Sequence, residues 1–198
     1  MPPDRKPWPM RWIALAILLF VALYTYLNLH YRKPGPAYEP YQDSRQRADL
    51  ERAGYRRITA RIDRPADPKP VSDAASVLSA AGGLPADLLA TFPVRPVLPD
   101  EIGSVGAAPT VEAMETYRIQ FSCTQSDNRR DIVGAHLYLK GGDIIALADS
   151  ELLPGGLIAR TRATVIRISV PPGMIPAGTY RVTLAGAQAA KTWTLQVH

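Results

Sequence analysis

Four side chains in the second half of the chain are of the types that bind soft metal ions. They are the thiol of Cys123, the imidazole of His136 and the thioethers of Met114 and Met174. Such groups together suit copper(I). Their spacing matches no known metal motif, and Cys123 lies in an alternating apolar row, where a buried thiol acts as a small hydrophobe. We therefore predict no metal site and no cofactor.

A polar segment, Asp127-Asn128-Arg129-Arg130-Asp131, is the second candidate for chemistry. Its carboxylate and amide oxygens could bind calcium, and its charges could bind a partner. Aspartate and asparagine are also typical of turns. A polar turn is therefore the preferred interpretation.

The histidines give no support for catalysis. His30 lies at the edge of an apolar segment, His136 is expected on the solvent face of a strand, and His198 is the last residue. The sequence also lacks the short motifs of hydrolases, metalloproteases and nucleotide-binding proteins. We predict that the protein is not an enzyme, and we assign no catalytic, cofactor-binding or metal-binding residue.

Residues 12–29 form an uncharged apolar segment, WIALAILLFVALYTYLNL. In helical form it would extend about 27 Å, close to the hydrocarbon thickness of a bilayer. A cleaved signal peptide is the alternative, but the small residues of a cleavage site are missing. We predict one retained transmembrane helix. Its edges carry aromatic rings of the kind found at membrane interfaces, namely Trp8, Trp12, Tyr24, Tyr26 and Tyr31.

The orientation of this span is set by few charges. Arg5, Lys6, Arg11 and the amino terminus precede it, and four basic residues follow it, so the positive-inside count is nearly balanced; the four are Arg32, Lys33, Arg45 and Arg47. A short basic tail kept inside is the usual outcome for a signal anchor. We expect a single-pass protein of the inner (cytoplasmic) membrane with its C-terminal domain on the periplasmic, extracytoplasmic side.

The net charge of +5 is unevenly distributed along the 198 residues. Residues 1–70 contain 13 basic and 7 acidic side chains, whereas residues 71–198 contain 10 and 11. The folded part is therefore nearly neutral, and we predict no nucleic-acid partner. The single cysteine excludes an internal disulfide. The 18 arginines against 5 lysines are typical of high-GC bacterial coding.

Between the span and the C-terminal domain, the predicted secondary structure changes several times. A proline-containing spacer is followed by a polar helix from Asp43 or Ser44 to about Ala53, ended by Gly54, and by a short strand over residues 55–63. Residues 64–112 hold eight prolines and predict a loose connector with helical pieces at 72–80 and 85–91. The predicted parts are a basic tail (1–11), the span (12–29), a juxtamembrane region (30–63), the connector (64–112) and a C-terminal domain (113–198).

The C-terminal domain shows alternation of period two. Six strands are predicted, and a connector strand at 94–98 or 102–105 would give the seven of an immunoglobulin-like antiparallel β-sandwich. A loop rich in proline and glycine precedes Tyr180, which lies at the start of a predicted strand. This arrangement resembles the tyrosine corner of immunoglobulin-like and fibronectin-type domains. We expect Tyr180 and Trp193 in the core. The six predicted strands are residues 117–123, 133–140, 143–147, 164–170, 179–184 and 192–197.

The layout of the whole chain resembles the FixH family of cbb3-type oxidase maturation proteins. The resemblance rests on a Lys6-Pro7-Trp8-Pro9 start, one span, the segment Tyr38-Glu39-Pro40-Tyr41 and a terminal β domain ending in a Pro-Ala-Gly hairpin. It implies a role in a respiratory membrane complex, and it assigns no functional residue.

Two hypotheses for function follow. The first is a non-catalytic accessory or assembly subunit of a bacterial membrane complex, with the lipid bilayer and other membrane-protein subunits as partners. Small residues in the span, Ala14, Ala16 and Ala22, would permit close helix approach. The second is an anchored envelope module of the immunoglobulin-like type that binds a ligand or surface polymer.

Overall fold

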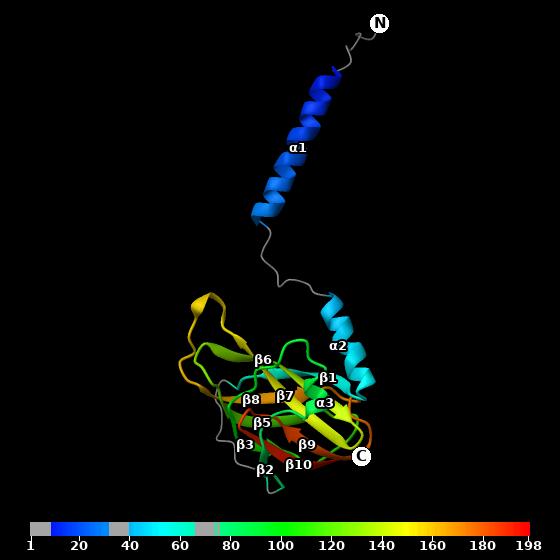
Figure 1. The fold of residues 1–198 in the computed structure, drawn as a ribbon, viewed down its shortest axis with the longest axis vertical. Helices are drawn as coiled ribbons and strands as arrows, with labels where there is room; N and C mark the ends of the chain where they lie inside the picture. Colours follow the sequence, from blue (N-terminus) through cyan, green and yellow to red (C-terminus); the bar gives the residue numbers. More distant parts are fainter. Residues whose placement is uncertain (1–8, 32–39, 66–73, 75) are drawn as a thin grey trace. The chain divides into compact units, whose positions relative to one another are not determined.

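A computed structural model describes residues 9–31, 40–65, 74 and 76–198. The chain divides into two compact units at residue 40, and each is described by itself. The first contains the helix α1 (Met10–Tyr31), drawn in blue in Figure 1. The second contains the β-rich domain of residues 41–198.

Helix α1 is long and apolar enough to cross a membrane. Its 22 residues correspond to about 33 Å at helical rise. No residue of α1 is buried, and its large apolar side chains, such as Leu18, Leu19 and Phe20, are exposed. The helix includes the predicted span of residues 12–29.

Within the described residues, the β-rich unit contains ten strands and three short or medium helical segments. The helices are α2 (Pro40–Arg52), α3 (Ala86–Leu89) and a 3₁₀ turn (Pro154–Gly156). The strands are β1 (Arg56–Asp63), β2 (Leu78–Ala81), β3 (Glu101–Ala107), β4 (Thr110–Val111), β5 (Tyr117–Thr124), β6 (Arg130–Lys140), β7 (Asp143–Leu152), β8 (Ala163–Val170), β9 (Gly178–Leu184) and β10 (Ala189–Val197).

The strands close into a barrel. The hydrogen-bonded order runs β10-β3-β5-β8-β1-β6-β7-β9, and β9 pairs with β10 again, while β2 and β4 add to β10 from outside this ring (Figure 1). The prediction of a mainly β domain after an apolar N-terminal helix is confirmed. The prediction of two separate sheets is corrected, because the pairing is continuous around the ring, including parallel contacts of β7 with β9 and of β10 with β3.

The barrel interior is an apolar core. It is formed by alternate residues of the strands that make up the closed ring. Phe121, Leu137, Ile166 and Leu195 are fully buried there. Trp193 is also interior, and its Nε1 donates a hydrogen bond to the hydroxyl of Tyr117 at 2.8 Å. The polar atoms of these two rings are therefore paired inside an otherwise apolar core.

A second apolar cluster lies on the outer face of β6 and β7. It joins Tyr138 and Leu147 of these strands to Leu50 of α2 and Leu88 of α3. Because both faces of β7 are covered, Ile144 and Ile145 are both buried although they are adjacent. We call this set of residues the outer cluster.

Several expectations for the connector are corrected. The expected helical piece at 72–80 lies partly outside the described residues, and its end belongs to strand β2, which pairs with β10. The piece at 85–91 does contain a helix, α3. Of the two proposed sites for an additional strand, 102–105 lies in β3 and pairs with β5, whereas 94–98 forms no strand. The connector therefore supplies part of the barrel wall.

The strand β1 also belongs to the barrel. It pairs with β6 and with β8, and both pairings are antiparallel. The short strand predicted at residues 55–63 is therefore part of the barrel wall. In β6 a bulge between Ile132 and Gly134 shifts the alternation, which buries Ile132 and leaves Val133 exposed instead of inward.

The expected burial of Tyr180 is confirmed. Tyr180 is buried, and its hydroxyl donates to the carbonyl oxygen of Pro176 at 3.0 Å, four residues upstream. The predicted hairpin of β6 and β7 is present as well, with Lys140 opposite Asp143. Of its two turn glycines, Gly141 has the positive φ, at 57°.

Candidate functional site

The site begins with a chain reversal between α2 and β1. Gly54 has a φ of 80°, and the amide of Tyr55 donates to the carbonyl oxygen of Leu50 at 2.8 Å. A left-handed residue just after a helix is the usual way to end it, and glycine adopts that conformation without steric cost. The reversal brings the residues of α2 next to the first residues of β1.

A polar cluster fixes this reversal to the rest of the domain. Asp87 of α3 accepts hydrogen bonds from the hydroxyl of Tyr55, at 3.0 Å, and from Nζ of Lys140, at 2.6 Å. The Lys140 ammonium also lies 4.7 Å from the centre of the Tyr55 ring. The hydrogen bond from Lys140 lowers the pKa of Asp87, and burial followed by the Asp87 carboxylate raises the pKa of Tyr55 to about 12. The cluster holds α3, β1 and β6 together.

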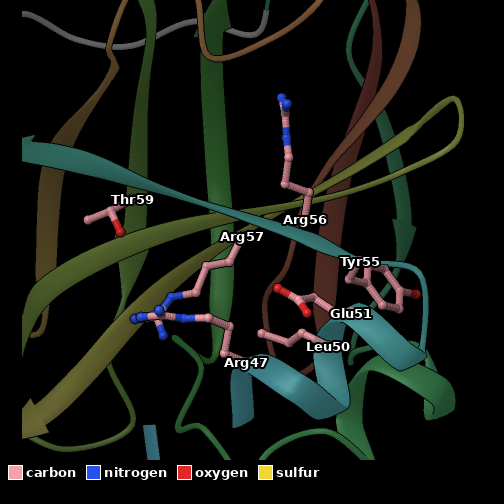
Figure 2. Close-up of a pocket in the computed structure, with 7 residues that line it drawn as sticks. All are labelled: Arg47, Leu50, Glu51, Tyr55, Arg56, Arg57 and Thr59. Carbon is pink, nitrogen blue, oxygen red and sulfur yellow. The ribbon is translucent and has the colours of Figure 1, made fainter. Parts of the chain in front are cut away.

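The first part of the site is an open hollow of about 500 Å³ between α2 and β1. Arg47 of α2 and Arg57 of β1 both line it, and their side chains extend to the same side of it in the view of Figure 2. Arg56 points away and donates to the carbonyl oxygen of Met174. We call this the arginine hollow, and its lining residues are Arg47, Leu50, Glu51, Tyr55, Arg56, Arg57 and Thr59.

A second hollow of about 370 Å³ also has Arg57 in its lining. One wall is the segment 92–97, and Phe92 packs edge-on against Tyr138 with ring centres 5.6 Å apart. The floor comes from the outer faces of β6 and β7. We call this the histidine hollow, lined by Gln46, Arg57, Phe92, Pro93, Val94, Arg95, Pro96, Val97, His136, Tyr138, Leu147, Asp149 and Ser150.

Arg57 and His136 are in direct contact in the histidine hollow. The guanidinium group of Arg57 lies 3.0 Å from Nε2 and 3.4 Å from Nδ1 of the imidazole. Burial, followed by the positive charge of Arg57, lowers the pKa of His136 to about 4. Burial also raises the pKa of Asp149. At neutral pH His136 is therefore an uncharged imidazole beside a permanent cation.

This arrangement suits binding better than acid–base catalysis. A general base works best when its pKa lies near the working pH, and that of His136 is well below neutrality. Guanidinium groups bind carboxylates and phosphates through paired N–H···O hydrogen bonds. Arg57 lies beside the apolar, proline-rich wall of the histidine hollow and lines the arginine hollow together with Arg47. Such a surface fits an acidic group with apolar neighbours.

The four residues weighed as a copper(I) set are not brought together. Cys123 lies in the barrel interior, where burial raises the pKa of its thiol to about 12. His136 contributes to the outer face, and Met114 is 78% exposed while Met174 is 39% exposed. Among the described residues, no group of three or more histidine, cysteine, aspartate or glutamate side chains could hold a metal ion.

Residues 127–129 lie in the turn between β5 and β6, and Arg130 and Asp131 are the first two residues of β6. The carboxylate of Asp127 accepts from the amide of Arg129 at 3.1 Å, and Asp131 pairs with Arg64 at 2.5 Å. Both acidic side chains thus have roles within the fold. The turn interpretation agrees with these contacts.

Sequence reasoning did not find Arg47 and Arg57 as a pair. It predicts a solvated polar helix around Arg47, with a basic surface for anionic lipid or a partner as the alternative, and it places Arg57 on the polar face of a short strand. The sequence does carry one signal: basic residues stand on both sides of the Gly54 helix stop, and a reversal there brings them together. Nothing in the sequence of residues 92–97 indicated that this segment forms a wall of the histidine hollow.

No protein-family model, curated protein or solved structure matches the chain.

Proposed function

We propose that the protein is a non-catalytic accessory or assembly subunit of a membrane complex, anchored by α1 and bound to a partner subunit through the arginine and histidine hollows. The observation that carries this proposal is that two arginines, one from α2 and one from β1, line the same open hollow. The apolar wall next to Arg57 adds a contact surface for a protein segment. A partner segment with an acidic residue beside apolar residues fits this chemistry.

The resemblance to the FixH family supports a respiratory oxidase as the complex. Both the FixH layout and this chain combine one apolar span with a terminal β domain. In a helix that crosses a membrane, the small residues Ala14, Ala16 and Ala22 of α1 permit close approach of a second span. The span and the hollows would then contact the same partner.

Crosslinking within native membranes tests this proposal. A photoreactive residue at Val94, which is 76% exposed in the wall of the histidine hollow, should give one discrete adduct with a membrane protein. Met114 is 78% exposed and lines neither hollow, so it is the matched control position. An identical adduct from position 114, or none from position 94, would contradict the proposal.

Replacing α1 by an unrelated span of equal length separates anchoring from recognition. The proposal expects weaker capture of the same partner at position 94, because one of two contacts is lost. The connector cannot be exchanged for a flexible linker in the same way, because β3 forms part of the barrel wall. Unchanged capture after the span exchange would leave the hollows as the sole contact.

The inner membrane and an extracytoplasmic C-terminal domain remain part of the proposal. Alkaline phosphatase folds only where disulfides form. A fusion after His198 in a bacterial host should therefore be active. An inactive phosphatase together with a fluorescent cytoplasmic fusion would reverse the orientation.

A second candidate function is an anchored module that binds a small ligand or polymer. The volumes of the two hollows, about 500 and 370 Å³, are in the range of small-molecule sites. Binding of a small dicarboxylate or sugar phosphate to the purified chain, lost with Arg57→Glu, together with no adduct at position 94, would favour this candidate.

A further inference from the structure

The connection between β7 and β8 exposes large aliphatic side chains. Residues 152–162, drawn in gold in Figure 1, project from the barrel. Leu152, Leu157 and Ile158 are 61%, 62% and 66% exposed. Leu152 ends β7, and Leu157 and Ile158 lie in the connection that follows; exposed aliphatic side chains of this size are poorly solvated by water. We call residues 152–162 the projection.

The backbone of the projection is held in a defined shape. The amide of Leu153 donates to the carbonyl oxygen of Arg129, and the amide of Ala159 donates to that of Asn128, both at 2.7 Å. Between them the chain turns through Pro154 and two glycines with φ of 67° and 74°. The aliphatic side chains are thus presented to the outside by a fixed turn.

The charge of the projection is positive. Arg160 and Arg162 are exposed, and residues 152–162 contain no acidic side chain, although Glu151 directly precedes them. Aliphatic residues next to arginines are typical of segments that lie in the interface of a membrane containing anionic lipids. The aliphatic groups enter the headgroup and acyl boundary, and the guanidinium groups bind lipid phosphates.

The projection links the end of β7 to the start of β8. Within residues 41–198, the projection and the start of α2 lie on the same side of the domain in the view of Figure 1, and β2 lies on the opposite side of that view. The eight residues between Tyr31 and Pro40 can reach no further than about 30 Å. A link of this length keeps the domain close to any membrane that α1 crosses.

We propose that the projection is a second membrane contact, with Leu152, Leu157 and Ile158 in the headgroup region and Arg160 and Arg162 on anionic lipid phosphates. The proposal rests on the anchoring of α1 and is independent of the partner in the hollows. Two points of contact would fix the barrel relative to the bilayer and so set the direction in which the hollows face.

Spin-label accessibility in vesicles tests this contact on the full chain. Single cysteines replace Leu157 in the projection, Leu78 on β2 as a matched exposed aliphatic control, and Leu19 in α1 as a reference for the bilayer interior. The native Cys123 is only 3% exposed, so it does not compete for the label. The vesicles contain phosphatidylcholine with or without phosphatidylglycerol.

The label at position 157 should collide more with oxygen and less with a water-soluble nickel complex than the label at position 78. This protection should be larger with phosphatidylglycerol. Each arginine near an anionic surface contributes about fivefold in binding, so Arg160→Gln and Arg162→Gln should each reduce the docked-to-free ratio by about that factor.

Other results would overturn the proposal. Equal nickel accessibility at positions 157 and 78, with position 19 protected, would show an anchored chain with a free projection. Exclusion of both oxygen and nickel at position 157 would mean that a second copy of the chain covers the projection. Nickel access at position 19 would contradict the anchoring itself, which separates the failure of the two ideas.

Discussion

The two faces of β6 and β7 have different chemistry. Toward the barrel interior these strands present apolar side chains such as Leu137 and Ile144. Toward the outside they present Tyr138 and Leu147 together with the polar groups His136 and Asp149. The same pair of strands therefore contributes to a uniform core on one side and to a mixed, hollowed surface on the other.

Under the proposed function, the inner face of these strands serves stability and the outer face serves recognition. A uniform apolar interior gains most from burial and offers nothing to a ligand. The outer face loses part of that gain, because it buries an imidazole next to a guanidinium and a carboxylate with a raised pKa. Such local costs are common where a surface has been arranged for binding. The following predictions test whether the interior determines stability and the outer face determines binding.

The largest expected effect is on the interior. Trp193→Ala removes a ring that is 3% exposed and leaves the Tyr117 hydroxyl without its donor. We expect a loss of about 3–5 kcal/mol in the free energy of unfolding, measured by thermal or denaturant unfolding of the full chain in detergent. A variant that melts like the wild type would mean that Trp193 does not pack in the core.

A smaller effect is expected in the outer cluster. Leu88→Ala truncates a fully buried side chain of α3, and we expect a loss of about 2–3 kcal/mol because the small cluster can relax around the cavity. Unfolding of the same full chain measures it. A loss equal to that of Trp193→Ala would show that the two clusters act as one core.

The buried imidazole predicts a pH dependence of the outer face. The pKa of His136, about 4 when folded, lies below its usual 6.5, so the unfolded chain binds more protons between these values. Stability should therefore fall as the pH drops from 6.5 to 4. After allowance for partial exposure we expect about 1–2 kcal/mol.

The control for this pH dependence is His136→Gln. Because Asp149 has a raised pKa, it titrates in the opposite sense, and it is present in both proteins. The wild type should lose more stability than the variant between pH 7 and pH 4.5. Parallel stability curves would show that the imidazole is not buried beside Arg57.

The smallest expected effect is at the tyrosine corner. Tyr180→Phe keeps the ring and removes only the hydrogen bond to Pro176, so we expect a loss of about 1 kcal/mol. The melting temperature of the full chain measures it. A loss as large as that of Trp193→Ala would require further interactions of the hydroxyl.

Alternation in the sequence predicted most strands, since residues 117–123, 164–170, 179–184 and 192–197 each lie within an observed strand. It could not predict barrel closure, because alternation tells which face is buried and not which strand is the neighbour. It failed at β2, whose run of small residues was interpreted as helix. It also failed at Val133, because a bulge changes the phase of a strand without a clear sequence signal.

The hollows were not predictable for a related reason. Arg47, Arg57 and His136 come from α2, β1 and β6, and only the chain reversal at Gly54 and the pairing of β1 with β6 bring them together. The segment 92–97 closes one side without forming a regular element. Its prolines indicated a connector, and nothing in their spacing indicated a wall.

The most direct test of the proposed division is one charge-reversed variant measured in two ways. Arg47→Glu with Arg57→Glu changes the outer face and leaves the interior untouched, and Arg118→Glu, at an exposed position of β5 outside both hollows, is its matched control. We predict that the adduct from position 94 disappears in the double variant and persists in the control, while both proteins melt within a few degrees of the wild type. An adduct that survives the double reversal in a folded protein would contradict recognition through the hollows.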